Sequence, residues 1–503
     1  MNSQAGPKSQ MRLSELLRGI VEVPVSVDRP VHGLAIDSRD VRPGTLFFAT
    51  RGTQRHGIEF AHAAVAAGAT AVLWEPDPEL APLLDALAVP VIAVADLGQR
   101  VGAIAECFHG SPSRHLQVLG VTGTNGKTSV AHFLAQMLDQ PPLRCGFIGT
   151  LGSGLFGELA PGTHTTPDAI QVHRILADFV TRGAACAAME VSSHALDQGR
   201  VNGVRFEIGI FTNLSRDHLD YHGDMARYAA AKRRFFLHHR PRFAVLNADD
   251  EVGRQWLEAL PSVVEPLAYS LHRPAAGVPT LVASDLRLTG QGMQFEVESP
   301  WGQAHIAAPL LGAFNASNLL ASLGALLLLG VTLPEAVTRL SHLRPPPGRM
   351  ECLGGGELPL VAIDYAHTPD ALEKTLQTLR AHTSGRLTCV FGCGGDRDAG
   401  KRPLMGQAVE QYADHGIITD DNPRSEDPAA IVAAIRQGQH AARRMPVIHD
   451  RRSAIRSALG AATVGDVVLI AGKGNEDYQI VGRERRVFSD RAVVLEWLAE
   501  VSQ

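Results

Sequence analysis

Short apolar runs alternate with polar, glycine-rich and helical stretches along most of the chain. Runs of this length between glycine, proline or charged residues predict buried strands. The segments with this character are 33–49, 68–74, 90–94, 116–123, 186–192, 207–214, 242–249, 358–367, 386–395, 414–423 and 466–475. Apolar residues at helical spacing fill intervals between them, as at 60–69 and 129–138. This alternation predicts an α/β fold with mostly parallel sheets covered by helices.

Two proline-bearing joints divide the pattern into three parts. "HGSPSRHL" at 109–116 and "RPPPGR" at 344–349 cannot form helix interiors. We therefore predict an N-terminal α/β domain (1–112), a central domain with a mostly parallel sheet (113–343) and a C-terminal Rossmann-like α/β domain (344–503). The last four strands each run into polar and glycine residues, and ligands of open α/β sheets bind at such strand ends. The C-terminal domain is thus predicted to hold a second binding site.

Composition narrows the class of protein without naming it. The 503 residues are 45% hydrophobic and 20% charged, with a formal net charge of -5, which argues against nucleic-acid binding. The longest apolar run, 319–331, is too short to span a bilayer and predicts a buried helix. The start of the chain has no secretion-signal pattern, and the six cysteines lack metal or redox spacing. We expect a cytoplasmic protein with no membrane insertion and no nucleic-acid partner.

The stretch "TGTNGKTS" at 122–129 follows a predicted strand and precedes a predicted helix. It misses the Walker spacing, yet strand, glycine loop and helix together favour a phosphate-binding loop. We expect ATP to contact the loop residues, which are Gly123, Thr124, Asn125, Gly126, Lys127 and Thr128. Lys127 would neutralise the β- and γ-phosphates, and the Thr128 hydroxyl would ligate Mg²⁺. The alternative is a glycine turn with a surface lysine.

Three further residues of the central domain are candidates for metal chemistry. Glu190 ends an apolar strand, where a buried carboxylate needs a partner such as Mg²⁺ or a core hydrogen-bond donor. His218 lies between Asp217 and Asp220 on a loop, although a lone histidine is more often structural. Lys232 stands beside basic neighbours in "AAAKRRFF", which also suits a solvated helix face.

Taken together, these motifs resemble the Mur ligases, the ATP-dependent amide ligases of peptidoglycan precursor synthesis. The resemblance covers nearly the whole chain and rests on "TGTNGKT", "HTTPD", "MEVSSHAL", "NLSRDHLDYHG", "AAKRRFF", "GAFNASNLLAS", "PPGRME" and "DYAHTPDAL". It implies a central P-loop ATPase-like domain and an acyl-phosphate intermediate that an amine attacks. "GCGGDRDAGKRPLMG", "DDNPRSEDP" and "GKGNEDYQ" are similar to the branch that adds meso-2,6-diaminopimelate to UDP-N-acetylmuramoyl-L-alanyl-D-glutamate.

The resemblance assigns roles around ATP. It implies two Mg²⁺ sites, one held by Thr128 and Glu190 and one by His218 and Lys232, with Lys232 carbamylated to N6-carboxylysine. Lys127, Lys232 and His218 would be the catalytic residues. Further ATP contacts are implied for Asn315, Asn318, Arg349, Asp364 and His367. For the two asparagines, helix N-capping is an equally good interpretation.

The resemblance also assigns the other two substrates. UDP-N-acetylmuramoyl-L-alanyl-D-glutamate would be bound by the N-terminal domain and by the residues Ser38, Thr165, Thr166, Ser192, Gln198 and Arg200. meso-Diaminopimelate would be bound by Arg397, Asp421, Asn422, Arg424, Gly472 and Glu476. Arginine suits the distal carboxylate of that amino acid because its planar fork pairs bidentately, and lysine-adding relatives differ at the arginine of "DNPR".

Two positions depart from the family pattern. Asn475 stands where the family usually has histidine, and His56 where aspartate is common. The closest rival functions are another ligase of the superfamily, such as a folylpolyglutamate synthase, and a P-loop NTPase that acts as a motor or switch. The second rival predicts ATP hydrolysis without any amine substrate. We expect a monomer.

Overall fold

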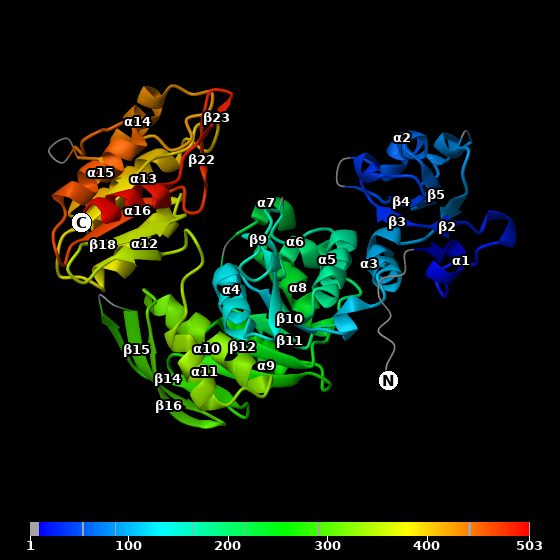
Figure 1. The fold of residues 1–503 in the computed structure, drawn as a ribbon, viewed down its shortest axis with the longest axis horizontal. Helices are drawn as coiled ribbons and strands as arrows, with labels where there is room; N and C mark the ends of the chain where they lie inside the picture. The colour runs from blue at the N-terminus through cyan, green and yellow to red at the C-terminus, as the bar shows by residue number, and fades with distance from the viewer. Residues whose placement is uncertain are drawn as a thin grey trace. The chain divides into compact units, whose positions relative to one another are not determined.

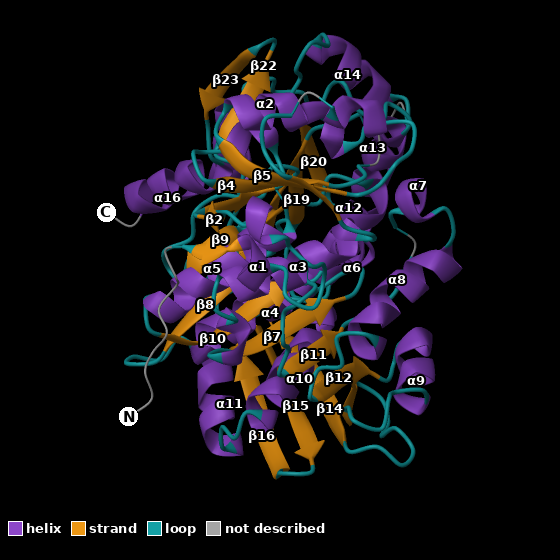
Figure 2. Ribbon diagram, turned by 90° about the vertical axis from the view of Figure 1, so that its right-hand side faces the viewer, coloured by secondary structure: helices purple, strands orange, loops and turns teal. Residues whose placement is uncertain are grey.

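The computed structural model describes residues 10–52, 55–85, 87–162, 164–215, 217–289, 292–440 and 444–501 (Figure 1). The chain forms two compact units, one of residues 1–270 with 274–280 and one of residues 271–273 with 281–503. Helices and strands alternate through both units, as the colours of Figure 2 show.

The N-terminal part of the first unit holds a four-stranded parallel sheet in the order β3-β4-β5-β6. Its elements are β1 (Met11–Arg12), α1 (Leu13–Leu16), η1 (Val25–Val27), β2 (Pro30–Val31), β3 (Gly33–Ala35), η2 (Ser38–Asp40), β4 (Thr45–Ala49), η3 (Gly57–Phe60), α2 (Ala61–Ala66), β5 (Ala69–Trp74), η4 (Ala81–Leu84), β6 (Val91–Ala93), α3 (Leu97–Phe108) and η5 (Pro112–Arg114). Strand β4 is buried at every position, because it lies inside the sheet with both faces covered.

The rest of the first unit holds a larger sheet. Its elements are β7 (Gln117–Thr122), α4 (Lys127–Leu138), β8 (Arg144–Gly149), β9 (Gly152–Leu155), α5 (Ala169–Thr181), β10 (Ala184–Glu190), α6 (Ser193–Asp197), β11 (Ile208–Phe211), α7 (Leu219–His222), α8 (Met225–Leu237), β12 (Phe243–Asn247), α9 (Glu251–Glu258) and β13 (Glu265–Ser270). The strands run in the order β13-β12-β11-β7-β10-β8-β9, and only β9 is antiparallel to its neighbour. Strands β7, β10 and β11 therefore end at one edge of the sheet.

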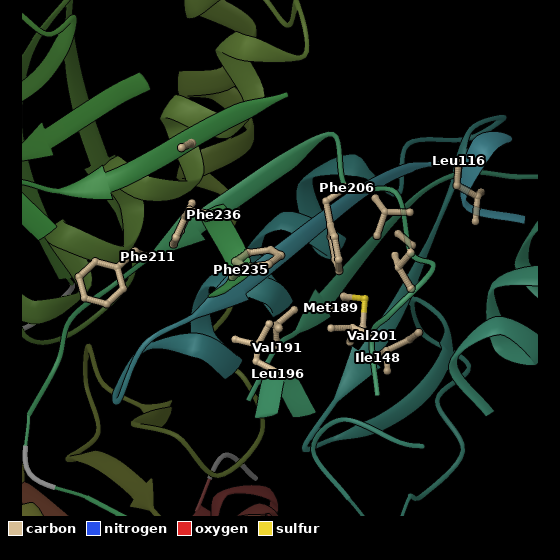
Figure 3. Packing of buried hydrophobic residues seen from close by; sticks show 14 of the residues in the cluster. Leu116, Ile148, Met189, Val191, Leu196, Val201, Phe206, Phe211, Phe235 and Phe236 are labelled. Carbon is tan, nitrogen blue, oxygen red and sulfur yellow. The ribbon is translucent and has the colours of Figure 1, made fainter. Parts of the chain in front are cut away.

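Aromatic packing fixes helix α8 against this sheet. Phe206 and Phe235 meet edge to face with ring centroids 4.8 Å apart, and Phe236 lies in the same buried cluster (Figure 3). Gly120 of β7 lies under these rings, since a Cβ there would come within 2.5 Å of Phe235. Gly120 thus belongs to the strand packing, and the phosphate loop begins at Gly123.

The second unit begins with an antiparallel meander and a buried helix. Its elements are β14 (Thr280–Thr289), β15 (Gly292–Ser299), β16 (Gly302–Ala308), α10 (Ala313–Leu328), α11 (Leu333–Ser341), β17 (Glu351–Gly354), β18 (Leu360–Asp364), α12 (Pro369–Arg380), β19 (Leu387–Phe391), α13 (Lys401–Tyr412), β20 (His415–Ile418), α14 (Pro428–Arg436), α15 (Arg451–Ala461), β21 (Val467–Ala471), β22 (Tyr478–Val481), β23 (Glu484–Val487) and α16 (Asp490–Val501). The five-stranded sheet has the order β17-β18-β21-β19-β20, and only β17 is antiparallel to its neighbour.

The predicted α/β fold class and the parallel character of both large sheets are confirmed. The predicted buried helix at 319–331 is confirmed as far as Leu328, where α10 ends, and the side chains of α10 after Asn318 are almost all buried. The meander β14–β16 was not predicted, because β14 and β15 alternate buried and exposed positions, as half-covered antiparallel strands do, and so lack the continuous apolar runs used to locate the other strands. The predicted domain limits stay a prediction. No helix in the described ranges is long and apolar enough to cross a membrane.

Candidate active site

The glycine loop joins β7 to α4 and depends on two left-handed backbone positions. Gly126 has φ +84° at the N-cap of α4, and Gly123 has φ +145°. A Cβ at Gly123 would lie 1.9 Å from the Thr212 hydroxyl, so only glycine fits there. Thr124 and Asn125 are held by the loop after β11, where the Thr124 hydroxyl contacts Ser215 O and the Asn125 amide donates to Asn213. The loop is therefore preformed.

Two lysine ammonium groups converge on one carbonyl of this loop. Lys127 Nζ donates to Gly123 O at 3.0 Å and to Thr124 O at 2.9 Å. Lys232 Nζ, from helix α8, donates to the same Gly123 O at 2.7 Å. Both lysine side chains thus lie at the loop that precedes α4, where the Lys127 charge and the helix N-terminus suit phosphate oxygens.

Glu190 ends β10 beside this loop and is fully buried. Its carboxylate accepts the Thr128 hydroxyl at 2.9 Å and the Thr150 backbone amide at 2.7 Å. Burial raises the pKa of Glu190, although Lys127 and the two threonines oppose that shift. Thr165 joins the cluster through its hydroxyl, 3.0 Å from that of Thr150. The cluster gathers hard oxygen ligands of the kind that Mg²⁺ prefers.

Lys232 is 1% exposed and faces the ring of Tyr228, with Nζ 4.5 Å from the ring centroid. Loss of solvent, together with nearby Lys127, lowers its pKa well below the usual lysine value. The alternative of a solvated helix face is therefore wrong. No carboxylate within the described ranges forms an ion pair with Lys232.

His218 lies near this cluster without contacting Lys232 directly. It occupies the left-handed N-cap of α7, its side chain is 45% exposed, and it lies 3.4 Å from Asp217. Its ring centroid is 6.1 Å from that of Tyr228, the neighbour of Lys232. The side chain of Asp220 lies outside the described residues. No three histidine, cysteine, aspartate or glutamate side chains of the described residues gather as a metal site.

Most of the residues predicted to bind the dipeptide part of the UDP substrate form one network. The Thr166 hydroxyl donates to Glu190 O at 2.8 Å and accepts from Ser192 N. Arg200 donates to Thr166 O and to the side-chain oxygen of Gln198. This network therefore lies against the strand end that carries Glu190. Ser38 begins η2 in the N-terminal sheet region and contacts none of these side chains within the described ranges.

In the second unit, the predicted ATP residues fall into two groups. Asn315 and Asn318 are buried in α10, where Asn318 donates to Asn315 and Asn315 donates to Leu311 O. The N-cap of that helix is Gly312, so the capping interpretation of the asparagines is wrong.

The other group lies at the end of β18. Asp364 accepts the backbone amides of Met350 and Ala366, and burial raises its pKa. The Arg349 guanidinium carbon lies 5.0 Å from the Tyr365 ring centroid, and the His367 ring packs edge to face on the same ring with centroids 4.7 Å apart. The segment that follows "RPPPGR" is thus hydrogen-bonded to the end of β18, through Met350 N and the Asp364 carboxylate.

The residues predicted to bind the amino acid lie at the carboxyl ends of β19, β20 and β21. Arg424 donates to Gly395 O at 2.7 Å and has φ +51°. Arg397 and Arg424 both lie close to Gly394, whose Cβ would come within 3.8 Å of one and 2.9 Å of the other. Two arginine side chains therefore lie beside one glycine, Arg424 with its guanidinium and Arg397 with its Cγ.

Acidic groups lie on adjoining loops of the same sheet edge. Gly472 has φ +115°, which favours glycine, and a Cβ there would come within 2.5 Å of the Asp421 carboxylate. Asn422 donates to Glu476 at 2.9 Å, and both also contact Lys473. Sequence reasoning missed Lys473, although a lysine between two glycines at a strand end was the available signal. It also missed Thr150, which follows the end of β8.

The two departures from the family pattern occupy different settings. His56 caps η3, accepting from Ile58 N at its Nδ1 and approaching Glu75 O at its Nε2. The histidine thus supplies the acceptor that an aspartate would supply. Asn475 is exposed, and its backbone packs on Gly348, where a Cβ would lie 2.1 Å from Asn475 N.

Comparison with known proteins places this chain in one family. The profile described as Mur ligase family, catalytic domain matches residues 30–109, the Mur ligase middle domain matches 121–326, and the Mur ligase, glutamate ligase domain matches 348–474. The chain belongs to the Mur ligase family. It is therefore an ATP-dependent ligase that forms amide bonds.

The names of the similar proteins give a narrower activity than the family does. The chain is 53% identical to the UDP-N-acetylmuramoyl-L-alanyl-D-glutamate–2,6-diaminopimelate ligase of Alkalilimnicola ehrlichii, over 97% of this chain and 99% of the relative. It is 50% identical to the ligase of the same name from Pseudomonas aeruginosa, over 92% and 94% of the two chains. A solved structure of a ligase of that name is 38% identical, with a TM-score of 0.76, over 98% of this chain and 100% of the other.

Proposed function

We propose that the protein adds meso-2,6-diaminopimelate to UDP-N-acetylmuramoyl-L-alanyl-D-glutamate, with ATP as co-substrate, in cytoplasmic peptidoglycan precursor synthesis. The relatives that carry this activity in their names support the proposal over nearly the full chain length. The observation that carries it is the mixed charge at the end of the C-terminal sheet. The Arg424 guanidinium and the Cγ of Arg397 lie beside Gly394 there, and Asp421 and Glu476 lie on neighbouring loops.

This charge pattern matches the amino acid. meso-Diaminopimelate has two ammonium and two carboxylate groups, so its site needs both signs of charge. Arginine forks pair with carboxylates bidentately, and carboxylates accept from ammonium groups. We assign Arg397 and Arg424 to substrate carboxylates, and Asp421, Asn422, Gly472 and Glu476 to the ammonium groups and backbone of the pocket. A lysine substrate would leave one guanidinium without its partner.

The phosphate loop would activate the acid. The substrate carboxylate takes the γ-phosphoryl group of ATP, releasing ADP, and the resulting acyl phosphate is attacked by the amine. The tetrahedral intermediate then expels inorganic phosphate and leaves the amide. In this scheme Lys127 and the loop amides hold the phosphates, and positioning with charge neutralisation accounts for most of the rate. No side chain needs to act as a nucleophile.

The residues fit one Mg²⁺ ion directly. The buried Glu190 carboxylate and the Thr128 hydroxyl lie 2.9 Å apart and offer the oxygen donors that a hard cation takes. We assign the first Mg²⁺ to this pair. When bound, the ion would neutralise phosphate charge.

The second Mg²⁺ site requires a changed Lys232. A bare ammonium would repel the ion, whereas a carbamate would supply oxygen ligands. Reaction of the neutral amine with CO₂ forms a new N–C bond and releases one proton. We propose that Lys232 is N6-carboxylysine and shares the second ion with His218. The burial of Lys232 without a carboxylate partner supports this assignment.

The remaining roles follow the family pattern. We propose that the UDP substrate contacts Ser38, Thr165, Thr166, Ser192, Gln198 and Arg200, and that ATP also contacts Asn315, Asn318, Arg349, Asp364 and His367. The network that joins Thr166, Ser192 and Arg200 beside Glu190 supports the first assignment. We further propose domains at 1–112, 113–343 and 344–503, and a monomeric enzyme.

Phosphate release with separate amino acids tests the proposed function. Purified protein with ATP, Mg²⁺ and UDP-N-acetylmuramoyl-L-alanyl-D-glutamate should release phosphate upon addition of meso-diaminopimelate and much less with lysine. Mass spectrometry should show the UDP-tripeptide. Equal phosphate release without any amino acid would favour a simple NTPase. Turnover with another amino acid in the panel would favour a different ligase of the superfamily.

A further inference from the structure

Lys473 is a fully buried cation inside the amino-acid cluster of the second unit. It follows β21 between Gly472 and Gly474, which have φ +115° and +53°. Its ammonium donates to Glu476 Oε2 at 2.9 Å and to Asn422 Oδ1 at 3.2 Å. Burying a charge is costly unless it is paired and hydrogen-bonded, and these two contacts supply that pairing.

The contacts of Lys473 fix the orientation of its two partners. Asn422 Oδ1 accepts from Lys473 and from Ile480 N, so the amide must direct its Nδ2 group the other way, and Nδ2 donates to Glu476 Oε2 at 2.9 Å. Glu476 Oε2 therefore receives two donors. Glu476 Oε1 receives none from the side chains and backbone that the structure describes.

We infer that Lys473 is a positioning residue for the amino-acid substrate, holding the Glu476 carboxylate through Oε2 so that Oε1 is left for a substrate ammonium group. This inference rests on the proposed function. Fixing the carboxylate before substrate binds removes the cost of ordering it at that moment. The Lys473 charge also offsets one of the two acidic groups, Asp421 and Glu476, at this sheet edge.

Steady-state kinetics of Lys473→Met test the inference. The substitution keeps an unbranched side chain and removes the charge, so Glu476 and Asn422 lose their shared partner. The KM for meso-diaminopimelate should rise about tenfold or more, while the KM for ATP stays within about twofold. The matched control is Lys374→Met, on the exposed face of α12, where Lys374 pairs with Asp370. That control should leave all three substrate constants unchanged.

A double-mutant cycle separates positioning from a general structural role. If Lys473 acts through Glu476, adding Lys473→Met to Glu476→Gln should change the KM for meso-diaminopimelate little further. If the double variant raises the KM for meso-diaminopimelate by the product of the two single effects, the inference is overturned. If Lys473→Met alone fails to fold, the double variant can still be measured, because it removes both charges of the pair. A KM for meso-diaminopimelate equal to that of Glu476→Gln alone would then support the inference.

The wild-type protein distinguishes this inference from the proposed function. If it shows no turnover with meso-diaminopimelate, both are overturned. If it uses meso-diaminopimelate and Lys473→Met keeps the wild-type KM, only the role of Lys473 is overturned.

Discussion

Lys232 and Lys473 are both almost completely buried, one beside the phosphate loop and one in the amino-acid cluster, yet their partners differ. Lys473 has the carboxylate of Glu476 at 2.9 Å and an amide oxygen. Within the part of the chain that the structure describes, Lys232 contacts the Gly123 carbonyl and the face of Tyr228, and no carboxylate forms an ion pair with it. A buried ammonium with a carboxylate forms a pair, whereas one with neutral partners is under strong pressure to lose its proton.

This difference separates two uses of a buried lysine. A paired lysine serves by its charge, as we infer for the positioning of Glu476. A lysine without an acid partner is a nucleophilic amine, since burial lowers its pKa well below the usual value. Such an amine can take up CO₂, which supports the carbamate proposed for Lys232. The two regions can therefore be compared by substituting each lysine and measuring which step of the reaction is impaired.

Lys127→Ala should have the largest effect. The Lys127 ammonium lies on the phosphate loop, donating to Gly123 O and Thr124 O. Without it, ligation should fall by about 10³-fold or more, because charge on the transferred phosphoryl group is no longer neutralised. Phosphate release measures this loss, and calorimetry should show UDP-precursor binding largely intact. Full activity of the variant would contradict the phosphate-loop assignment.

Lys232→Ala should be nearly as damaging but chemically rescuable. We expect a loss of about 10²- to 10³-fold in ligation, because the variant lacks the proposed carbamate oxygens. Short-chain carboxylic acids should restore part of the activity by occupying the space of the lost side chain. Lys127→Ala is the control, since carboxylates cannot replace an ammonium there. Absence of rescue, together with an unmodified lysine by mass spectrometry under native conditions, would refute the carbamate.

Arg424→Ala should change the preference between amino acids more than the use of ATP. A fully desolvated guanidinium would make the wild type prefer meso-diaminopimelate over lysine by about 10⁴-fold. The Arg424 side chain is only partly buried, so we expect a preference below that value. The variant should lose most of that ratio through a higher KM for meso-diaminopimelate, with a smaller effect on ATP. The measurement is kcat/KM for both amino acids. An unchanged ratio would place selectivity elsewhere.

Arg424→Lys is the informative companion to Arg424→Ala. The Arg424 backbone lies at φ +51° and exchanges hydrogen bonds with Ile480 and Gly482. Alanine and lysine meet the same backbone strain there, so a difference between the two variants reports the side chain. Lysine keeps the charge but not the bidentate fork, and it should recover only part of the preference.

The sequence predicted the sheets better than the contacts within the site. Strand ends such as those at Glu190 and Asp364 could be located because apolar runs stop at a polar residue. The meeting of Lys127 and Lys232 on one carbonyl could not, because it depends on how α8 packs over β7. Lys473 was missed for a related reason, since its burial depends on two left-handed glycines and a distant asparagine.

Substituting His132 should give the smallest effect, and it extends the comparison to a buried histidine that we assign to no substrate. It lies in α4 among aromatic rings, the nearest being Phe156 with centroids 5.3 Å apart. Its Nδ1 has no hydrogen-bond partner among the described residues. Burial lowers the pKa of His132 from 6.5 to about 4. The folded protein therefore keeps the ring neutral, while the unfolded chain takes up the proton first as the pH falls.

The sign of the pH effect follows from that order. The stabilisation is fully present above about pH 6.5 and is lost as the pH falls to about 4, up to about 3 kcal/mol for this ring. His132→Phe should therefore lose less stability between pH 6.5 and pH 4 than the wild type, measured by thermal unfolding at several pH values. Part of the acid sensitivity should remain, because burial lowers the pKa of His109 and His239 in the same direction. His62→Phe, on the exposed face of α2, is the control, and identical pH profiles for His132→Phe and the wild type would show that His132 is not kept neutral by burial.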